Sequence, residues 1–360
     1  MPRRPRRLRR RRARGPGGGA VSPTSVPTLV DVAREAGVSI ATASRVLSGA
    51  QHVSEARARA VRKAITELGY RHNAVASALR SQRTETVGLI LPRYTTGFLS
   101  ALIESVSEAL DDAGLSLVLR YSAEGDDHDA RTVESLLSRR VDGLVICPPT
   151  EEVSRDAVAA ADRVPVVQVG RHIFGDGTDS VGLDDNRATD LLVGALADGG
   201  TTEVVTVGLS PADPADARRI AAVRASCELR GVRFGGARPA GAELAGGVAA
   251  ANELVASGDL ARLDAVVCAN DDVAHGLVTV LRLNGVDVPG AVQVASLLDV
   301  SSVEGDDERE ITTLRHPWPA MGREAVRLLL DALASGDRDD SGGARRVTLA
   351  PRLLHGRSTR

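Results

Sequence analysis

The larger part of the chain alternates short aliphatic runs with longer segments in which apolar residues recur every three or four positions. An uninterrupted aliphatic run is typical of a parallel strand buried on both faces, and the longer period is typical of an amphipathic helix. The predicted strands are 87–91, 115–119, 143–147, 164–169, 204–207, 265–268, 292–297, 311–314 and 347–354. The predicted helices are 98–113, 129–139, 151–161, 186–197, 216–230, 248–256, 271–283 and 319–333.

This alternation predicts an α/β fold built from doubly wound parallel sheets. The strands fall into two series, and because the second begins near Ser180 we expect two lobes. The expected first lobe spans about 87–178 and 312–340, and the expected second lobe spans about 179–311 and 341–357. In folds of this kind a ligand binds between the lobes, beside the carboxyl ends of the strands.

Residues 28–70 have a shorter pattern that predicts a helix-turn-helix followed by a third helix at about 54–68. Thr28 with Asp31 fits a capping box that opens the first helix, and Ser39 fits an N-cap that opens the second. Gly37 falls at the turn, where a positive φ favours glycine. The residues that would pack these helices together are small and apolar: Val32, Ala33, Ala36, Val38 and Val46. This arrangement favours a DNA-binding domain.

Charge is divided unevenly along the chain. Residues 1–14 contain nine arginines and no acidic residue, and residues 28–83 contain nine basic and four acidic residues. The formal net charge is nevertheless −2, so the remainder is acidic. The basic end would attract a polyanion that the acidic remainder would repel. We interpret residues 1–27 as a disordered arginine-rich tail and linker; whether this segment contacts DNA phosphates, or belongs to the native product, stays open.

Several other classes of protein are disfavoured. No apolar run approaches the roughly 20 residues of a membrane span, and the arginine-rich start lacks the apolar core of a signal peptide. Three widely spaced cysteines are expected to be reduced core thiols. There is no G-x-G-x-x-G after a strand, no P-loop, no G-x-S-x-G and no metal-spaced His/Cys cluster. We therefore expect a cytoplasmic protein that is not an enzyme and holds no cofactor or metal.

Several ordered segments resemble the lactose-repressor (LacI/GalR) family of bacterial transcription regulators. They include VDVAREAGVS, SRVLSG, ITELGYRHNAVASALRSQRTETVGLILP, CANDDVAHGLVTVLRLNGVDVPG and ITTLRHPWPAMGREAVRLLL. The resemblance implies an all-α helix-turn-helix DNA-binding domain at 28–72, and a hinge helix with a linker at 73–86. It also implies a two-lobed, periplasmic-binding-protein-like core at 87–360 that binds an effector and dimerises.

The family resemblance places the second helix of the helix-turn-helix in the major groove of DNA. Ile40 and Ala41 then occupy base-reading positions, and Arg45 lies one turn on, where it can contact a guanine or a phosphate. Further candidates for contacts to phosphates or base edges are Ser39, Thr42, Ser44 and His52. A solvated helix face is the alternative for Thr42 and Ser44. Ala43 stands where valine is usual, which predicts a thinner layer of packing beneath this helix.

By the same resemblance, Asn73 begins a hinge helix, 73–80, that pairs with its copy across a homodimer and enters the minor groove. Leu79 would wedge open a central base step, and Ala76 is small enough for close contact between the two helices. Ordinary helix packing is the alternative for Leu79. A helix this short is marginal alone in water, so we expect it to order against DNA or a partner.

Arg219 and Asp271 match the arginine and the acidic residue with which the family binds its ligands. Such a pair suits a polyol, because hydroxyl groups both donate and accept hydrogen bonds. The alternatives are that Asp271 caps a helix N-terminus and that Arg219 is an exposed helix charge. Weaker candidates for the same site are Phe98, Asn270, Asp299 and Trp318. Leu297–Asp299 departs from the family's usual GFDD or GYDD, and no aromatic residue lies at 240–242, so the ligand stays open.

These features predict a sequence-specific DNA-binding regulator, in its simplest form a repressor, controlled by a small-molecule effector such as a sugar bound between the lobes. The expected partners are double-stranded operator DNA, the effector and a second copy of the chain, with no membrane involved. An exported sugar-binding protein and a Rossmann-like enzyme are the alternatives. No heptad-rich tail follows Leu354, so a homodimer is favoured over a tetramer.

Overall fold

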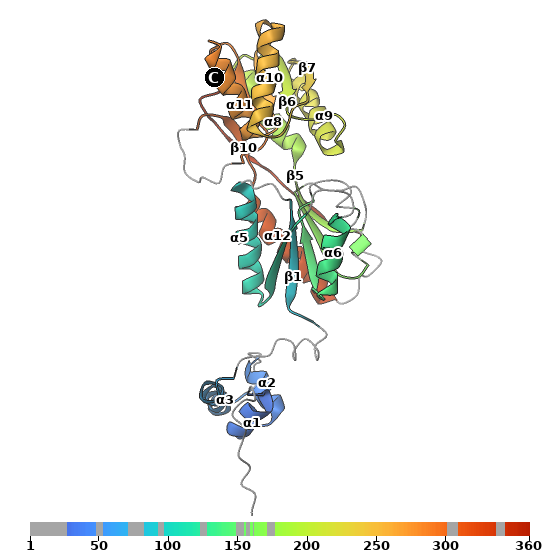
Figure 1. The fold of residues 1–360 in the computed structure, drawn as a ribbon, viewed down its shortest axis with the longest axis vertical. Coiled ribbons are helices and arrows are strands. Elements are labelled where there is room, and N and C mark those ends of the chain that lie inside the picture. The colour runs from blue at the N-terminus through green and yellow to red at the C-terminus, as the bar shows by residue number, and fades with distance from the viewer. Residues whose placement is uncertain are drawn as a thin grey trace, which may run out of the picture. The chain divides into compact units, whose positions relative to one another are not determined.

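The computed structural model describes residues 27–47, 53–70, 83–92, 97–122, 128–148, 155, 159–160, 162–170, 177–300, 309–335 and 343–360, with the backbone alone at 97–98 and 128–130. Contacts divide the chain into two compact units, 1–76 and 77–360. The first contains short helices, and the second contains two six-stranded sheets with their covering helices (Figure 1).

The described part of the first unit consists of α1 (Leu29–Glu35), α2 (Ile40–Leu47) and α3 (Glu55–Leu68). Both expected helix caps are confirmed: Thr28 and Asp31 form a capping box at α1, and Ser39 Oγ accepts a hydrogen bond from the backbone N–H of Thr42 at 3.1 Å. Gly37 has a φ of 61° at the turn, where an L side chain would be strained. The helices enclose a small core of Val32, Ala33, Ala43, Val61 and Ala64.

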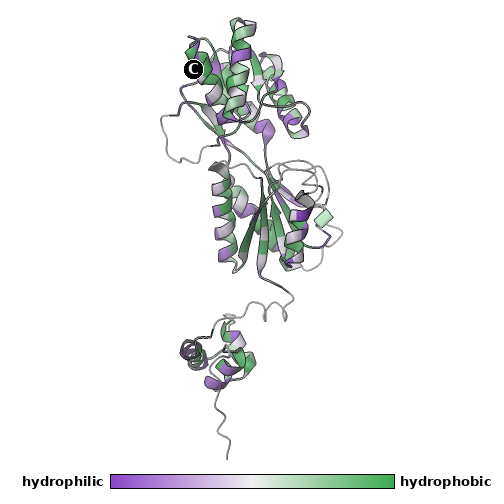
Figure 2. Cartoon of the chain, in the orientation of Figure 1, coloured by the Kyte–Doolittle hydropathy of each residue, from purple (hydrophilic) through white to green (hydrophobic). Residues whose placement is uncertain are grey.

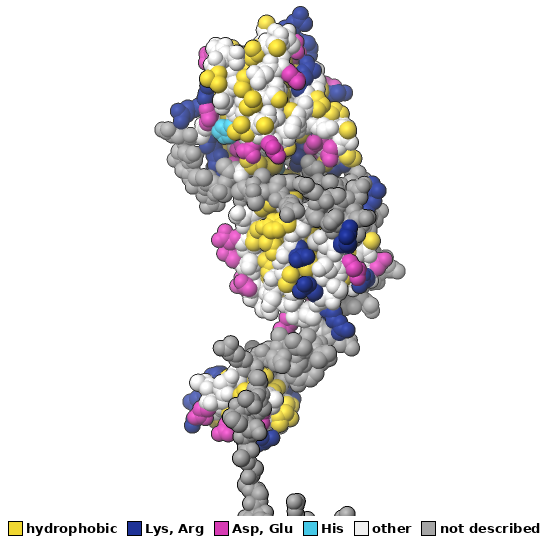
Figure 3. All heavy atoms as spheres, in the orientation of Figure 1, with side chains coloured by type: hydrophobic (Ala, Val, Ile, Leu, Met, Phe, Trp, Pro, Cys, Tyr) yellow, Lys and Arg dark blue, Asp and Glu magenta, His cyan; other side chains and the backbone are white. Residues whose placement is uncertain are grey.

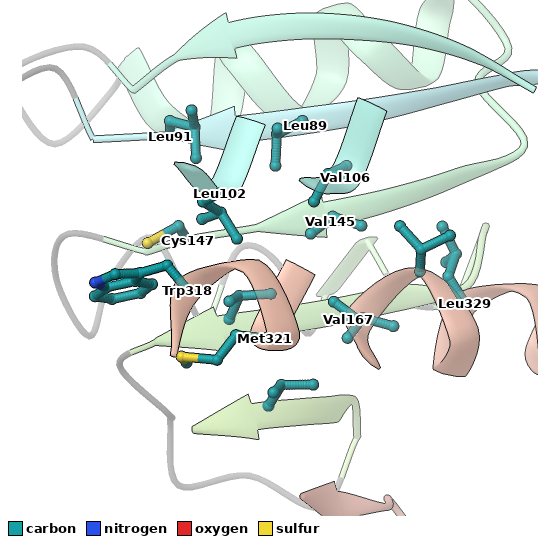
Figure 4. Packing of buried hydrophobic residues seen from close by; sticks show 14 of the residues in the cluster. Leu89, Leu91, Leu102, Val106, Val145, Cys147, Val167, Trp318, Met321 and Leu329 are labelled. Atoms are coloured by element: carbon teal, nitrogen blue, oxygen red, sulfur yellow. The ribbon is translucent and has the colours of Figure 1, made fainter. Parts of the chain in front are cut away.

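The first sheet lobe has the strand order β11-β5-β4-β3-β1-β2, and all of its strand pairs are parallel. Its strands are β1 (Thr86–Leu91), β2 (Ser116–Tyr121), β3 (Gly143–Ile146), β4 (Val166–Gly170), β5 (Asp179–Leu183) and β11 (Arg346–Leu349). Helices α5 (Gly97–Asp112) and α12 (Trp318–Ser335) cover one face, and α6 (His128–Ser138) covers the other (Figure 1). Leu89 and Leu91 therefore pack with α5 and α12 (Figure 4), whereas Ile90 packs with α6.

The second sheet lobe has the strand order β12-β10-β9-β8-β6-β7. Its strands are β6 (Glu203–Val207), β7 (Arg233–Arg238), β8 (Ala265–Cys268), β9 (Gln293–Ser296), β10 (Thr312–Arg315) and β12 (Arg352–Leu354), of which β12 alone is antiparallel to its neighbour. Helices α10 (Leu244–Ser257) and α11 (Asp271–Leu283) cover one face, and α8 (Asp185–Asp198) and α9 (Pro214–Leu229) cover the other. The hydrophobic strands inside both lobes (Figure 2) confirm the predicted doubly wound architecture.

Among the described residues the chain passes between the two sheet lobes three times, from β5 to α8, from β10 to α12 and from β11 to β12. These crossings correct the lobe boundaries predicted from the sequence. Strands β5 and β11 belong to the first lobe, not the second, and β10 belongs to the second lobe, not the first. The reason is that an aliphatic run indicates a buried strand without indicating which of two parallel sheets it joins.

Three other details differ from the sequence pattern. The pattern does not predict β7, because this edge strand reads RFGGAR and its side chains are exposed or half-buried. The single strand predicted at 347–354 is two strands, which are separated at Ala350 and Pro351 and join different sheets. The helix predicted at 151–161 lies almost wholly outside the described residues.

Candidate nucleic-acid interface and effector site

Helix α2 presents its first residues to solvent. Ile40 is 46% exposed, and Ala41 and Arg45 are also exposed. Ala43 is fully buried in the core shared with α1 and α3. Helical geometry therefore places residues 40, 41 and 45 away from the core that holds Ala43. The exposed face combines two small or apolar side chains with one guanidinium.

The polar candidates on this helix have less uniform surroundings. Ser39 is exposed, and its Oγ lies 2.9 Å from Thr42 Oγ1, with either hydroxyl able to donate. Because Ser39 Oγ also accepts from the Thr42 N–H, this side chain already caps α2. Thr42 and Ser44 are half-buried. Their contact with DNA stays a prediction.

Helix α3 adds exposed basic residues to the first unit: Arg57, Arg59, Arg62 and Lys63. Arg62 and Lys63 lie 3.7 Å from Glu55 and Glu67 respectively, and such exposed ion pairs contribute little to stability. On the face of the second unit shown in Figure 3, basic and acidic side chains are interspersed.

Some of the predicted site residues cannot be placed. His52, Asn73, Ala76 and Leu79 lie outside the described residues. Phe98 is the second residue of α5, and only its backbone is described. The proposed roles of these five residues remain predictions from the family resemblance.

Asp271 lies at the first position of α11, just after the carboxyl end of β8, and is only 5% exposed. It is not the cap of this helix, because Asn270 occupies the N-cap position and its Oδ1 accepts from the backbone N–H of Val273 at 3.0 Å. Asn270 Nδ2 also donates to the carbonyl of Ala242 at 2.8 Å, so both groups of the Asn270 amide are engaged within the protein.

The surroundings of Asp271 favour its uncharged form. Burial is the main cause that raises the pKa of its carboxyl to about 7, and the negative charge of Asp299 raises it further. The hydroxyls of Ser296 and Thr313 act in the opposite direction. Asp271 Oδ1 is buried and has no hydrogen-bond partner among the described residues.

Asp299 follows β9 and is 4% exposed. Arg315, at the end of β10, donates from Nε to Asp299 Oδ2 at 3.0 Å, and Arg309 Nη1 lies 3.3 Å from the same oxygen. The backbone N–H of Asp299 donates to the carbonyl of Leu314. Two arginines therefore hold this carboxylate. Neither the composition of the sequence nor the spacing of its residues indicates this arrangement.

Arg219 lies on α9 with its side chain 18% exposed, and its Nε is 3.5 Å from Asp185 Oδ1 at the start of α8. The alternative of an exposed helix charge is therefore wrong. The positive charge of Arg219 also acts on His316, a buried residue that the sequence pattern did not single out. Burial, followed by Arg219, lowers the pKa of His316 to about 3.

His316 lies in the crossing from β10 to α12. Its Nε2 donates to the carbonyl of Leu297 at 3.1 Å, which assigns the remaining proton of the neutral ring to Nε2. Nδ1 is buried, with no hydrogen-bond partner among the described residues. The only cue in the sequence is its place directly after a predicted strand. The charges of Arg219 and Asp299 both act on His316, and the charge of Asp299 acts on Asp271. We call these four residues, with Arg309 and Arg315, the polar cluster of the second lobe.

Trp318 belongs mainly to a hydrophobic core. It is 8% exposed and packs in the first-lobe cluster near Cys147 and Met321 (Figure 4). Its ring centroid is 5.7 Å from that of His316. Trp318 therefore borders the polar cluster through His316 while contributing to the packing beneath α12.

Two further findings concern other classes of site. Within the described ranges, no group of three or more His, Cys, Asp or Glu side chains could hold a metal ion. None of the described helices is long and apolar enough to cross a membrane.

Two family models match the chain. Residues 28–73 match the bacterial regulatory proteins of the lacI family, and residues 193–359 match a periplasmic binding protein-like domain. The first range contains α1, α2 and α3, the helices described in the first unit, and the second contains the polar cluster.

Characterised relatives extend the similarity over most of the chain. The ribose operon repressor of Escherichia coli (strain K12) is 31% identical over 84% of this chain and 92% of its own length. The regulator GalR of the same organism is 31% identical over 84% and 88%. The catabolite control protein A of Streptococcus mutans is 30% identical over 84% and 90%. All three are named as repressors, regulators or control proteins, as expected for a chain that is not an enzyme.

Solved structures share the fold. A lac repressor dimer bound to operator and an anti-inducer has a TM-score of 0.77 at 23% identity, covering 93% of this chain and 99% of that chain. A complex of the transcriptional regulator CelR with cellobiose has a TM-score of 0.65 at 28% identity, covering 92% and 99%. Given relatives that are at least 30% identical over nearly their whole length, this chain belongs to the lacI family of bacterial transcriptional regulators.

Proposed function

We propose that the chain represses transcription by binding a pseudo-palindromic operator as a homodimer, and that a small-molecule effector of the sugar class controls this binding. The observation that carries the proposal is the exposed start of α2 within a helix-turn-helix that matches the family model. Helix α2 is held by a packed face around Ala43, and its opposite side is free of that core. A rigidly supported, exposed helix is what entry into a major groove requires.

The side chains of α2 define the expected readout. Ile40 and Ala41 can make apolar contacts, for example to thymine methyl groups, and Arg45 can bind a guanine edge or a phosphate. Exposed arginines on α3 add electrostatic attraction to the phosphate backbone. A homodimer presents two such helices, so the preferred duplex would contain two half-sites related by twofold symmetry.

The polar cluster of the second lobe is the proposed effector site, with Arg219 and Asp271 as its main contacts. A carboxyl group accepts hydrogen bonds and a guanidinium donates them, so together they match the hydroxyls of a sugar, which both donate and accept. The relatives named for ribose and the structure titled as a cellobiose complex support this ligand class. An exported sugar-binding protein would not need the helix-turn-helix of residues 28–73.

The linkage between the two sites follows from the position of the cluster. Arg315 and His316 lie at a crossing between the sheet lobes, so a ligand bound beside them has a different affinity for different lobe arrangements. If the favoured arrangement of the lobes also changes how the two hinge helices pair, binding of the effector changes the affinity for the operator. The roles proposed for Leu79 and Ala76 in the hinge rest on the family resemblance alone.

The DNA-binding part is tested by selecting duplexes from a random library with the full chain, then measuring affinity for the selected duplex by fluorescence anisotropy. Arg45→Ala is expected to weaken binding by about tenfold or more, since a good bidentate contact contributes about 1–3 kcal/mol. Arg139→Ala removes the same charge from the other unit and is expected to change affinity little. Equal losses in the two variants would overturn the role assigned to α2.

The effector part is tested by a thermal-shift screen of D-ribose, D-galactose, cellobiose, nucleosides and sugar phosphates. A ligand present at 100 times its Kd stabilises the folded protein by about 2.7 kcal/mol. The compound that raises the unfolding temperature of the unsubstituted protein should no longer raise that of Arg219→Ala. A compound that stabilises Arg219→Ala and the unsubstituted protein equally would place the effector elsewhere.

A further inference from the structure

Two buried carboxyl groups lie side by side in the polar cluster of the second lobe. Asp271 and Asp299 are 5% and 4% exposed, they follow the paired parallel strands β8 and β9, and the backbone N–H of Asp271 donates to the carbonyl of Leu298, the residue before Asp299, at 3.1 Å. Charging two buried carboxyl groups at neighbouring strand ends is costly, so we expect one of them to retain a proton.

The surroundings decide which carboxyl keeps the proton. Asp299 is held as an anion by Arg309 and Arg315, at 3.3 and 3.0 Å. Asp271 has no ion pair with either arginine among the described residues, and its Oδ1 has no hydrogen-bond partner there. The proton therefore belongs on Asp271, whose free oxygen is also the atom that the proposed effector would meet.

The other charged and titratable groups do not change this assignment. They are Arg219 and Asp185, which lie 3.5 Å apart on α9 and α8, His316 in the crossing, Asp272 on α11 and Cys268 at the end of β8. Arg219 is matched by Asp185. His316 is neutral, and burial keeps the pKa of the Cys268 thiol above its usual range. Asp272 is exposed to solvent.

We propose that Asp271 and Asp299 hold one proton between them in the ligand-free protein, with Asp299 fixed as the anion by its two arginines, and that a hydroxyl-bearing effector displaces this proton when it binds Asp271. Ligand hydroxyls that donate to Asp271 favour its carboxylate form, so the proton leaves to the solvent. Asp299 is a positioning residue in this scheme, since it acts on the ligand only through Asp271. The binding step rests on the proposed effector function, whereas the held proton does not.

Thermal unfolding as a function of pH tests the held proton without any ligand. Asp271 binds its proton more tightly in the folded than in the unfolded chain, so its contribution to stability falls as pH rises from about 4 towards 7. Asp271→Asn is permanently neutral and should gain in unfolding temperature relative to the unsubstituted protein over this range. Asp272→Asn, which changes the adjacent exposed carboxyl on the same helix, should run parallel to the unsubstituted protein.

Carbon-13 NMR of aspartate carboxyl groups in the full chain provides a second readout. The signal that is missing in Asp271→Asn should titrate near neutral pH. In Asp299→Asn it should titrate at least one pH unit lower, because a negative charge is removed and the two arginines then face Asp271. An Asp271 signal that titrates near pH 4 in the unsubstituted protein would overturn the proposal, as would an Asp299→Asn variant that leaves its midpoint unchanged.

Calorimetry with D-ribose and D-galactose tests the displacement step. For a sugar that binds at pH 6.5, the buffer takes up a fraction of one proton. The measured heat should therefore differ between phosphate and Tris, because their enthalpies of protonation differ. The affinity for the sugar should rise towards pH 8. Equal heats in both buffers would overturn proton displacement. If neither sugar binds while the NMR midpoint stays near neutrality, the proposed sugar effector fails and the held proton stands.

Discussion

Asp264 shows how one side chain organises the beginning of a strand. It accepts hydrogen bonds from the backbone N–H groups of Thr202 and Glu203 and from the Thr202 hydroxyl, so it joins the loop before β8 to the start of β6. These donors, with the Thr202 hydroxyl first, keep the pKa of Asp264 below its ordinary value. The carboxylate form therefore stabilises the folded state.

Asp264→Asn is expected to destabilise the protein by about 1–2 kcal/mol at pH 7, because it weakens charge-assisted hydrogen bonds. A lowered folded pKa means that the contribution is present above about pH 4 and is lost as pH falls below it. Urea unfolding at pH 7 and at pH 3.5 measures the difference, which should shrink in acid. A difference that is the same at both pH values would contradict the assigned ionic role.

At the scale of elements, α10 and α11 approach closely through glycine. A Cβ added to Gly276 would lie 2.2 Å from the carbonyl oxygen of Leu244, and one added to Gly247 would lie 2.0 Å from the carbonyl oxygen of Val273. Both positions are in helices, where glycine has a conformational cost relative to alanine. The short distance between the backbones, rather than helix propensity, therefore explains these residues.

Gly276→Ala should force α10 away from α11 and reduce stability by about 1–3 kcal/mol, the usual cost of overpacking. The free energy of unfolding in urea provides the measurement. Gly343 has no atom within 4 Å of an added Cβ, so Gly343→Ala serves as the matched control and should change stability little. If Gly276→Ala were as stable as that control, the backbone contact would not limit the distance between the helices.

The sequence predicts most of these elements because each is a local pattern. The capping box at Thr28, the turn at Gly37 and the strand 265–268 agree with the structure. Lobe membership is different, since β5, β10 and β11 differ from the other strands only in which sheet they join. That choice depends on the three crossings, which leave no periodic signal in the residues.

The polar cluster could be predicted only in part for a similar reason. Arg219 and Asp271 were identified through family resemblance, and their positions in the second lobe are consistent with a common site. His316 and the arginines at 309 and 315 come from other strand ends, and their meeting at Asp299 depends on tertiary structure. Asn270 and Trp318 were candidates by position, but one caps α11 and the other packs in a core.

At the scale of the whole molecule, charge separates the basic N-terminal part from the acidic remainder. Deleting residues 2–14 should weaken binding to all duplexes alike and reduce the slope of log affinity against log salt, since phosphate contacts release counterions without reading sequence. Anisotropy titrations between about 50 and 200 mM salt measure this slope. An unchanged slope would mean that these nine arginines do not contact DNA.

The central claim is that this chain recognises a particular duplex through α2 under the control of a ligand. The most direct measurement compares the affinity of the full chain for its selected duplex and for a scrambled duplex of equal length at 0.15 M salt, with and without the stabilising sugar. We predict a preference of about 10³-fold or more for the selected duplex, and a change in that preference on adding the sugar. Equal affinity for the two duplexes would contradict the account.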